Sequence, residues 1–253
     1  MTYAVALNLD EGLVFCSDSR TNAGMDNVAT FRKMHVFEVP GARVLVLLTA
    51  GNLAITQSVV NRLAQTDNDG NRLIDTAPTL YHAAEMVGSA VREVFKRDGQ
   101  AMRAQHAGFS ASFILGGQIG SLAPRLFHIY SAGNFIESSP ETPYFQIGET
   151  KYGKPIIDRL IRPATPLDVA AKCVLISFDS TMRSNVSVAP PYDLLCYRTD
   201  HLKVDFVRRL DADDPYMNSL SKSWSEGIRR AFDALPAPDW LAPVHPNKGG
   251  AQA

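Results

Sequence analysis

The second position of this 253-residue sequence carries the first side chain whose type and place could do chemistry. An initiator methionine is normally removed when a small residue follows, so loss of Met1 would leave Thr2 with a free α-amine. Such an amine has a pKa of about 7.7–8.0, and near neutral pH a useful fraction is unprotonated. It could take the proton of the Thr2 hydroxyl, directly or through a water, so that one residue supplies nucleophile and base. Many proteins begin with Met-Thr for no such purpose, so the dipeptide alone decides nothing.

Two charged residues further along could activate this nucleophile. Asp18 stands at the end of the second strand of a predicted hairpin that begins at the chain start. Because the second strand of a hairpin runs back antiparallel to the first, we expect Asp18 to lie beside Thr2. Lys33 begins a later strand, and an ammonium held by a carboxylate beside a hydroxyl would lower the pKa of that hydroxyl. The alternative is that Asp18 is a turn residue and Lys33 a solvated surface charge.

Residues 49–52 (TAGN) mark a place where a buried strand is predicted to break into a helix. Backbone N–H groups at such a helix start are oriented donors for an oxyanion. Gly51 would also allow a substrate carbonyl to approach the backbone closely. An ordinary strand-to-helix turn would have much the same sequence.

Other catalytic signatures are missing from the sequence. There is no GxSxG elbow, HExxH pair, Walker loop or EF-hand, and the six histidines show no metal-ligand spacing. We therefore expect no metal and no organic cofactor. The glycine-rich run at 116–120 does not open a helix, so a hairpin turn is the predicted use.

Composition excludes several classes of protein. Lys and Arg (25) nearly balance Asp and Glu (26), so the basic excess that nucleic-acid binding requires is absent. No apolar run reaches the roughly 18 residues of a membrane span, and the first ten residues do not resemble a secretory signal. Three scattered cysteines are typical of small buried hydrophobes in a reducing compartment. A cytoplasmic protein that binds neither nucleic acid nor membrane is the expectation.

Apolar periodicity predicts strands first, then two helices, strands, helices and strands again. The predicted strands cover 3–9, 13–16, 35–39, 44–48, 109–115, 126–130, 144–147, 194–198 and 204–207. Helical spacing is found over 55–63, 80–94 and 171–178. Hairpins followed by paired helices favour an α+β fold, an antiparallel sheet sandwich covered by helices, over an alternating βαβ fold. We expect one domain over 1–235 and a Pro/Gly-rich, poorly ordered tail over 236–253.

The C-terminal part of the domain, 214–235, is predicted to be a further helix. Asp214 and Pro215 suit the N-cap and the first helical position. A single apolar stripe follows, made of Met217, Leu220, Trp224, Ile228 and Ala231. This helix either caps the core or binds a neighbouring subunit.

Several segments together resemble a known protein family. TYAV (2–5), SDSR (17–20), FRK (31–33) and TAGN (49–52) are similar to the N-terminal half of proteasome β-type subunits and of their bacterial relative HslV. SDSRTNAG (17–24), TFRKMHVFE (30–38) and IGETKYGKPIIDR (147–159) look like the Anbu (ancestral β-subunit) family of bacterial proteasome homologues. The resemblance covers nearly the whole chain. It implies the N-terminal-nucleophile hydrolase fold, a four-layer αββα sandwich, and self-assembly as rings or an open helical stack.

The resemblance also implies roles for the residues singled out above. Thr2 would be the nucleophile with its own amine as base, Asp18 and Lys33 the activating pair, and the Gly51 amide part of the oxyanion hole. Thr49 and Leu53 would face the pocket for the substrate side chain.

The chain departs from the peptidases of this class near the α-amine. Where they have a serine after a glycine, this chain has Glu149, whose carboxylate could hold the α-ammonium and raise its pKa. The aspartate and serine that support the amine in that class correspond to Asp179 and to either Ser180 or Ser184.

We therefore expect a threonine-type peptidase or amide hydrolase that is active in a self-assembled oligomer and cleaves a peptide or amide substrate. Glu149 motivates the alternative of an assembly-forming scaffold with little hydrolytic activity. A third possibility is an amidase or amide-transferring enzyme with a narrow substrate. The sequence leaves open whether an ATP-driven unfoldase is a partner.

Overall fold

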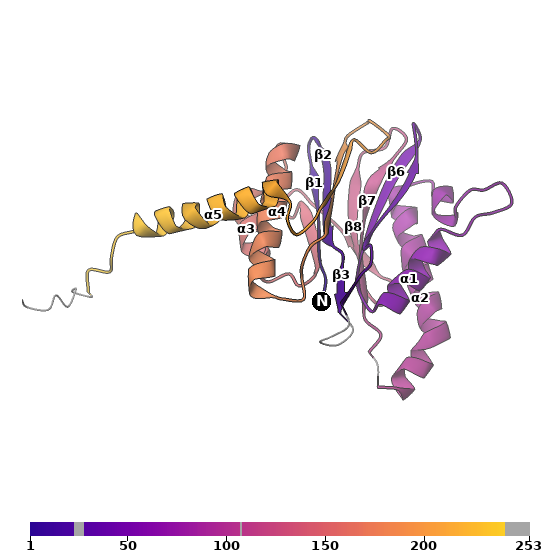
Figure 1. Ribbon diagram of the computed structural model, residues 1–253. Coiled ribbons are helices and arrows are strands. Elements are labelled where there is room, and N and C mark those ends of the chain that lie inside the picture. The colour runs from indigo at the N-terminus through magenta and orange to yellow at the C-terminus, as the bar shows by residue number, and fades with distance from the viewer. Residues whose placement is uncertain (23–27, 107, 241–253) are drawn as a thin grey trace, which may run out of the picture.

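The computed structural model describes residues 1–22, 28–106 and 108–240. In this part of the chain two five-stranded antiparallel sheets face each other, and helices cover both outer faces (Figure 1). The result is the predicted α+β sandwich of four layers in the order αββα, so the predicted fold class is confirmed.

The first sheet contains the chain start. Its strand order is β10 (Tyr144–Gly148), β1 (Tyr3–Leu9), β2 (Gly12–Asp18), β11 (Tyr192–Arg198) and β12 (Phe206–Leu210). Helices α3 (Lys154–Leu160) and α4 (Leu167–Ser184) lie against its outer face. The strand predicted at 204–207 is shifted towards 206–210.

The second sheet has the strand order β5 (Met34–Val39), β6 (Arg43–Gly51), β7 (Ala111–Ile119), β8 (Arg125–Ile129) and β9 (Phe135–Glu137). It is covered by α1 (Leu53–Leu63) and α2 (Leu80–Ala104), with a short 3-10 turn, η1 (Leu73–Thr76), between them in the chain. A small ladder of β3 (Arg20–Asn22) and β4 (Val28–Thr30) follows the first hairpin.

Three separate clusters of buried apolar side chains hold the four layers of the sandwich together. Strand β1 shows how one strand serves two of them, because successive side chains of a strand point to opposite faces. Tyr3, Val5 and Leu7 pack towards α3 and α4, whereas the small Ala4 and Ala6 face the other sheet. Both faces of β1 are therefore buried, and its first residues are held firmly between neighbours.

The glycine run at 116–120 was predicted as a hairpin turn, and this prediction is wrong. Gly116 and Gly117 lie inside β7, and the turn begins only at Gly120. A Cβ on Gly116 would approach the Phe15 ring to 2.8 Å, and one on Gly117 would meet the Val44 carbonyl oxygen at 2.0 Å. These glycines thus mark a close approach inside the sandwich.

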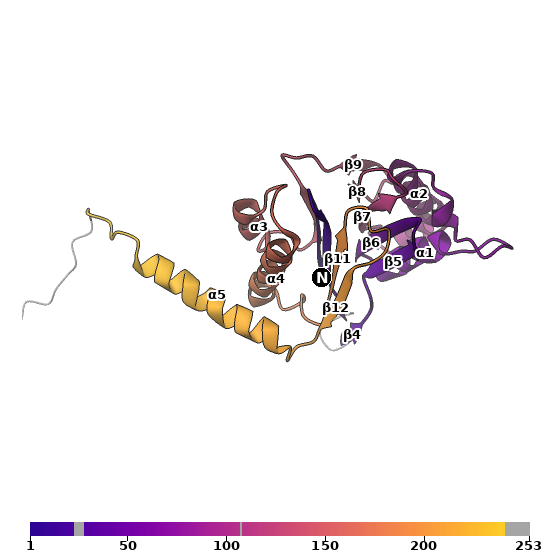
Figure 2. The ribbon, with the colours of Figure 1, turned by 90° about the horizontal axis from the view of Figure 1, so that it is seen from above.

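Helix α5 (Pro215–Asp233) forms as predicted, and the Asp214 side chain accepts a hydrogen bond from Met217 N at its start. Only its first half packs on the body, beside α4, while its second half extends away as an arm (Figure 2). That residues 1–235 form a single domain remains a prediction, and 241–253 of the predicted tail lie outside the described residues. No helix in the described ranges is long and apolar enough to cross a bilayer.

Candidate functional site

The first hairpin places Asp18 next to the chain start, as its antiparallel return predicts. Strands β1 and β2 pair with Ala4 opposite Ser17, which brings the end of β2 to the beginning of β1. The Tyr3 backbone N–H donates to Asp18 Oδ1 over 3.0 Å. Asp18 is completely buried and Thr2 is only 9% exposed. The carboxylate is therefore fixed to the residue that follows Thr2.

Lys33 is not a solvated surface charge. Its ammonium donates to both Asp18 oxygens at 2.9 Å and to the Arg20 carbonyl oxygen at 2.6 Å. Burial lowers the pKa of Lys33, although the Asp18 charge opposes this shift. Burial likewise raises the pKa of Asp18 to about 6 against the opposing effect of Lys33. The site thus holds a buried ion pair beside the chain start.

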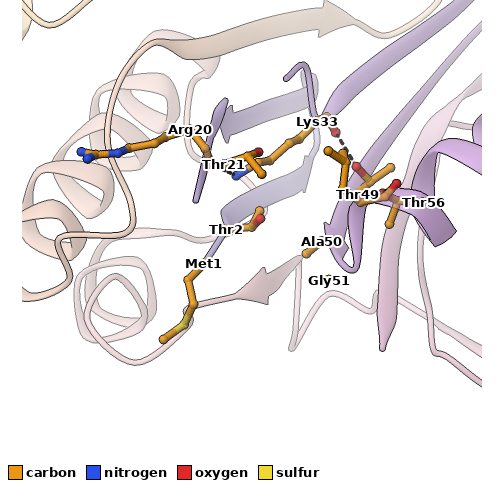
Figure 3. A pocket seen from close by; sticks show the side chains of 10 residues that line it. Met1, Thr2, Arg20, Thr21, Lys33, Thr49, Ala50, Gly51 and Thr56 are labelled. Carbon is orange, nitrogen blue, oxygen red and sulfur yellow. Dashed lines mark hydrogen bonds between the residues drawn. The ribbon is translucent and has the colours of Figure 1, made fainter. Parts of the chain in front are cut away.

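A small pocket of about 90 Å³ opens at Thr2. Lys33, Thr49, Gly51 and Leu53 line it together with Thr2, so the residues predicted from separate parts of the sequence meet in one place (Figure 3). The wall also contains five residues to which the sequence analysis gave no role in the pocket: Met1, Arg20, Thr21, Ala50 and Thr56. The Arg20 side chain extends away from Lys33, whereas Thr49 lies across the pocket (Figure 3). The pocket is therefore formed by both sheets and by the start of α1.

Gly51 is the last residue of β6, in front of α1, and has a positive φ of 110°. The Asn52 side chain accepts hydrogen bonds from Ala54 N and Ile55 N, so these first helical amides are already used. Ala111, which is opposite Gly51 in the strand register, exchanges hydrogen bonds with the Ser131 hydroxyl through its own N–H and C=O. Gly51 N–H is consequently the best-placed donor for an oxyanion in this turn.

Glu149 lies on the opposite side of the chain start from Asp18. Its backbone N–H donates to the Thr2 carbonyl oxygen at 2.7 Å, and Glu149 is 8% exposed. The preceding Gly148 has a positive φ of 83°, and a Cβ there would meet the Thr2 oxygen at 2.0 Å. The glycine therefore lets the two backbones come together.

Asn185 is a site residue that the sequence analysis missed. Its side-chain amide donates to Glu149 Oε2 at 3.0 Å and contacts Met1 Sδ at 3.7 Å. It follows the end of α4 in the chain, and no motif in the sequence connects it with Glu149. Only the packing of α4 against the first sheet brings the two together.

The residues that were expected to support the α-amine lie in different surroundings from Glu149. They are Asp179, Ser180 and Ser184. Asp179 is buried in α4 and pairs with Arg183 at 3.1 Å. Ser180 is half-buried and Ser184 exposed. Among the hydrogen bonds and ion pairs of the described ranges, none connects these three residues with Thr2 or Glu149. The roles expected for Asp179 and for Ser180 or Ser184 at the α-amine stay predictions, and the residue after α4 that contacts Glu149 is Asn185.

The electrostatics at the chain start favour an unprotonated amine. Burial lowers the pKa of the Met1 α-amine, and the nearby Lys33 charge lowers it further, while Asp18 acts in the opposite direction. The Met1 amine therefore loses its proton more readily than an amine in water.

Solved structures of known proteins match the chain along nearly its whole length. A Gly-1 mutant of Anbu from Hyphomicrobium sp. strain MC1 has 50% sequence identity and a TM-score of 0.86, covering 94% of this chain and all of its own. Anbu (ancestral beta-subunit) from Yersinia bercovieri has 48% identity and a TM-score of 0.87, covering 94% of this chain and 99% of its own.

A third structure, the helical assembly of the Anbu complex from Pseudomonas aeruginosa, has 48% identity and a TM-score of 0.88. The match covers 93% of this chain and 98% of the Pseudomonas aeruginosa chain. Neither a family model nor a curated protein matches the chain.

Proposed function

Since the chain belongs to the Anbu family of proteasome-like proteins, we propose that it is an N-terminal-nucleophile amide hydrolase with Thr2 as its nucleophile. The observation that carries this proposal is the buried Lys33–Asp18 ion pair beside Thr2, at a pocket that a substrate could enter. A buried ion pair adds little to the stability of a fold, because the cost of removing both charges from water offsets most of their attraction. A role in the reaction is the better reason for such a pair beside Thr2.

Removal of Met1 creates the base that the reaction needs. The Thr2 amine takes the proton of its own hydroxyl, directly or through a water, while the oxygen attacks the carbonyl carbon of a peptide or amide. Lys33 stabilises negative charge developing on the hydroxyl oxygen, and Asp18 holds the ammonium in place. The Gly51 N–H donates to the oxyanion that forms from the carbonyl oxygen.

The second half of the reaction reverses these proton transfers. The C–N bond of the substrate breaks, and the leaving amine takes the proton from the Thr2 α-ammonium. This leaves the acyl group as an ester on the Thr2 oxygen. A water molecule, deprotonated by the free α-amine, then attacks the ester and releases the carboxylic acid. Thr49 and Leu53 on the pocket wall contact the substrate side chain.

Glu149 tunes the α-amine in this proposal. A carboxylate close to an ammonium favours the charged form and so raises the pKa of the amine. Asn185, which donates to Glu149, orients that carboxylate. Burial and Lys33 act in the opposite direction, as they do for Met1. The balance between these effects sets the fraction of active enzyme at neutral pH.

Self-assembly is part of the proposal. The Pseudomonas aeruginosa relative is described as a helical assembly, and we expect this chain to associate with further copies of itself. An assembly could keep Thr2 away from folded proteins while admitting peptides or small amides.

The second candidate function is a scaffold of the same fold with little hydrolytic activity. The observation in its favour is Glu149, because a carboxylate that kept the α-amine protonated would remove the base. A third candidate is an amidase or amide-transferring enzyme with a narrow substrate, which the small pocket favours.

One experiment separates the catalyst from the scaffold. The purified protein is first weighed by intact mass spectrometry to establish that Thr2 is the first residue. It is then treated with a peptide epoxyketone, which reacts with an N-terminal threonine through its hydroxyl and its amine. We expect one probe mass per chain on Thr2 and none on the Thr2→Ala variant. An assembled protein with Thr2 at its start that remains unlabelled would favour the scaffold. A peptide-library screen then separates a general peptidase from a narrow amidase.

A further inference from the structure

Three further threonine side chains line the pocket at Thr2. Thr21 comes from β3, Thr49 from β6 and Thr56 from α1, so three separate elements each contribute a hydroxyl group. Thr49 and Thr56 are each only 4% exposed. A substrate side chain that enters the pocket would therefore meet hydroxyl groups as well as the apolar side chain of Leu53.

Two of these hydroxyl groups have used their proton but not their lone pairs. The Thr56 hydroxyl donates to the Leu53 carbonyl oxygen at 3.0 Å. The Thr49 hydroxyl donates to the Lys33 carbonyl oxygen over a long 3.5 Å. A hydroxyl has one proton and two acceptor lone pairs, and no group in the part of the chain that the structure describes donates to either oxygen. Both oxygens can therefore accept a hydrogen bond from a substrate.

The Thr21 hydroxyl is the third polar group of the wall. Its oxygen is buried and has no hydrogen-bond partner among the described residues. A buried hydroxyl without a partner is costly, and no hydrogen bond to those residues holds this one in its present rotamer. Rotation about the Cα–Cβ bond would turn it towards the pocket, where it could both donate to a substrate and accept from it.

The charges around the pocket favour an uncharged substrate side chain. An ammonium has three protons, and Lys33 donates all of them, two to Asp18 and one to the Arg20 carbonyl oxygen. An acidic side chain would thus find no free ammonium proton there. A basic side chain would face the positive charge of Lys33, and none of the described residues that line the pocket carries a carboxylate.

The volume of the pocket limits the length of that side chain. About 90 Å³ equals the share of roughly three water molecules at about 30 Å³ each, which suits a side chain of a few heavy atoms and excludes an aromatic ring. Met1 also lines the pocket, and its side chain extends away from Thr49 and Thr56 (Figure 3). Loss of Met1 therefore opens the pocket at the chain start and leaves the threonine wall unchanged.

We propose, on the basis of the amide hydrolysis proposed above, that the pocket selects peptides with a short, uncharged side chain that carries a hydrogen-bond donor. Serine, threonine or asparagine would then precede the cleaved bond. The amide nitrogen of asparagine would donate to Thr49 and Thr56, and its amide oxygen would accept from Thr21. A hydroxyl side chain would satisfy part of the same set.

Matched epoxyketone probes test this preference on the full chain that begins with Thr2. Two probes of a pair differ only in the residue next to the epoxyketone, which is threonine or valine in one pair and asparagine or leucine in the other. The members of a pair have nearly the same shape, but only one has polar side-chain atoms. We expect the polar member to label Thr2 at least tenfold faster, a ratio that corresponds to ~1.4 kcal/mol. Probes with phenylalanine or arginine at this place should label more slowly than either polar probe.

Valine substitutions test which residues supply the preference. Thr21→Val/Thr56→Val keeps the shape of the wall but removes two hydroxyl groups, and the variant should lose most of the preference for the threonine probe over the valine probe. A merely structural effect would slow both probes alike and leave their ratio unchanged. The matched control is Thr76→Val, because the exposed Thr76 hydroxyl donates to the Leu73 carbonyl oxygen just as Thr56 donates within α1. This control should keep the wild-type ratio.

The possible outcomes separate this preference from the proposed function. A chain that begins with Thr2 and is labelled by none of the probes contradicts amide hydrolysis at Thr2. Equal labelling within both pairs, or faster labelling by valine and leucine, contradicts only the preference for a polar side chain. A Thr21→Val/Thr56→Val variant that keeps the wild-type ratio would likewise overturn the role given to these two threonines.

Discussion

The Lys33 ammonium reaches both carboxylate oxygens of Asp18 at 2.9 Å, and side-chain exposure is 6% for the lysine and 0% for the aspartate. The same carboxylate accepts the N–H of Tyr3, the residue that follows the proposed nucleophile. Asp18 thus connects the cation of the site to the backbone of the chain start, and its removal should affect both stability and chemistry.

Replacing Asp18 separates these two effects. Asp18→Asn leaves a buried, unpaired ammonium, and we expect the free energy of unfolding to fall by about 3–5 kcal/mol. Asp18→Asn/Lys33→Met removes both charges and should recover much of this loss, while epoxyketone labelling of Thr2 stays absent in both variants. Urea unfolding and intact mass measure the two properties. Labelling of the double variant at the wild-type rate would exclude a role for the pair in activating Thr2.

The rate at which the epoxyketone labels Thr2 should depend on pH in two steps. Below the pKa of the α-amine, the logarithm of the labelling rate should rise with pH with a slope of about one, because the free base is required. The pKa of Asp18 is raised by burial to about 6, so this carboxylate becomes neutral as the pH falls through that value and Lys33 loses its paired charge. The slope should therefore increase to about two below pH 6. A slope of one down to pH 5, in protein that stays folded, would contradict the requirement for ionised Asp18.

Glu149→Gln should make the α-amine a better base at neutral pH. Loss of the carboxylate removes an interaction that favours the ammonium, so the pKa of the Thr2 amine should fall. The break in the pH profile of labelling that reports this amine should shift to lower pH. Glu226→Gln, at an exposed position of α5, is the matched control and should leave the profile unchanged. A break that does not move in Glu149→Gln would show that Glu149 does not hold the amine.

Gly148→Ala should displace Thr2. The new Cβ would lie 2.0 Å from the Thr2 carbonyl oxygen, so β10 and the chain start must separate, and the Glu149 N–H would lose its acceptor. We expect loss of Thr2 labelling together with a lower melting temperature. Gly120→Ala provides the control, because Gly120 also has a positive φ but no atom within 4 Å of its Cβ position. That variant should lose roughly 1 kcal/mol of stability and keep its labelling.

Much of the site could be predicted because local patterns determine it. The hairpin from Tyr3 to Asp18 has a short turn and clear apolar runs, which together fix how its two strands pair. Asp18 must therefore return to the chain start. Thr49, Gly51 and Leu53 lie around one strand-to-helix junction, where a few residues fix the geometry. These parts needed no knowledge of distant neighbours.

The remaining features depend on tertiary packing. Gly116 resembles a turn residue in sequence, but the Phe15 ring of the facing sheet requires a glycine there. Asn185 and Glu149 are 36 residues apart in the chain, and they meet only because α4 packs on the first sheet. The seven residues of α3 are too few to show a clear helical period.

The peptide group between Thr2 and Tyr3 is anchored at both ends, its oxygen by Glu149 N–H at 2.7 Å and its nitrogen by Asp18 at 3.0 Å. Neither anchor involves Met1. Proteolytic removal of Met1 would therefore expose the Thr2 amine in surroundings that are already folded. Maturation would then require the cleavage of one peptide bond and no refolding.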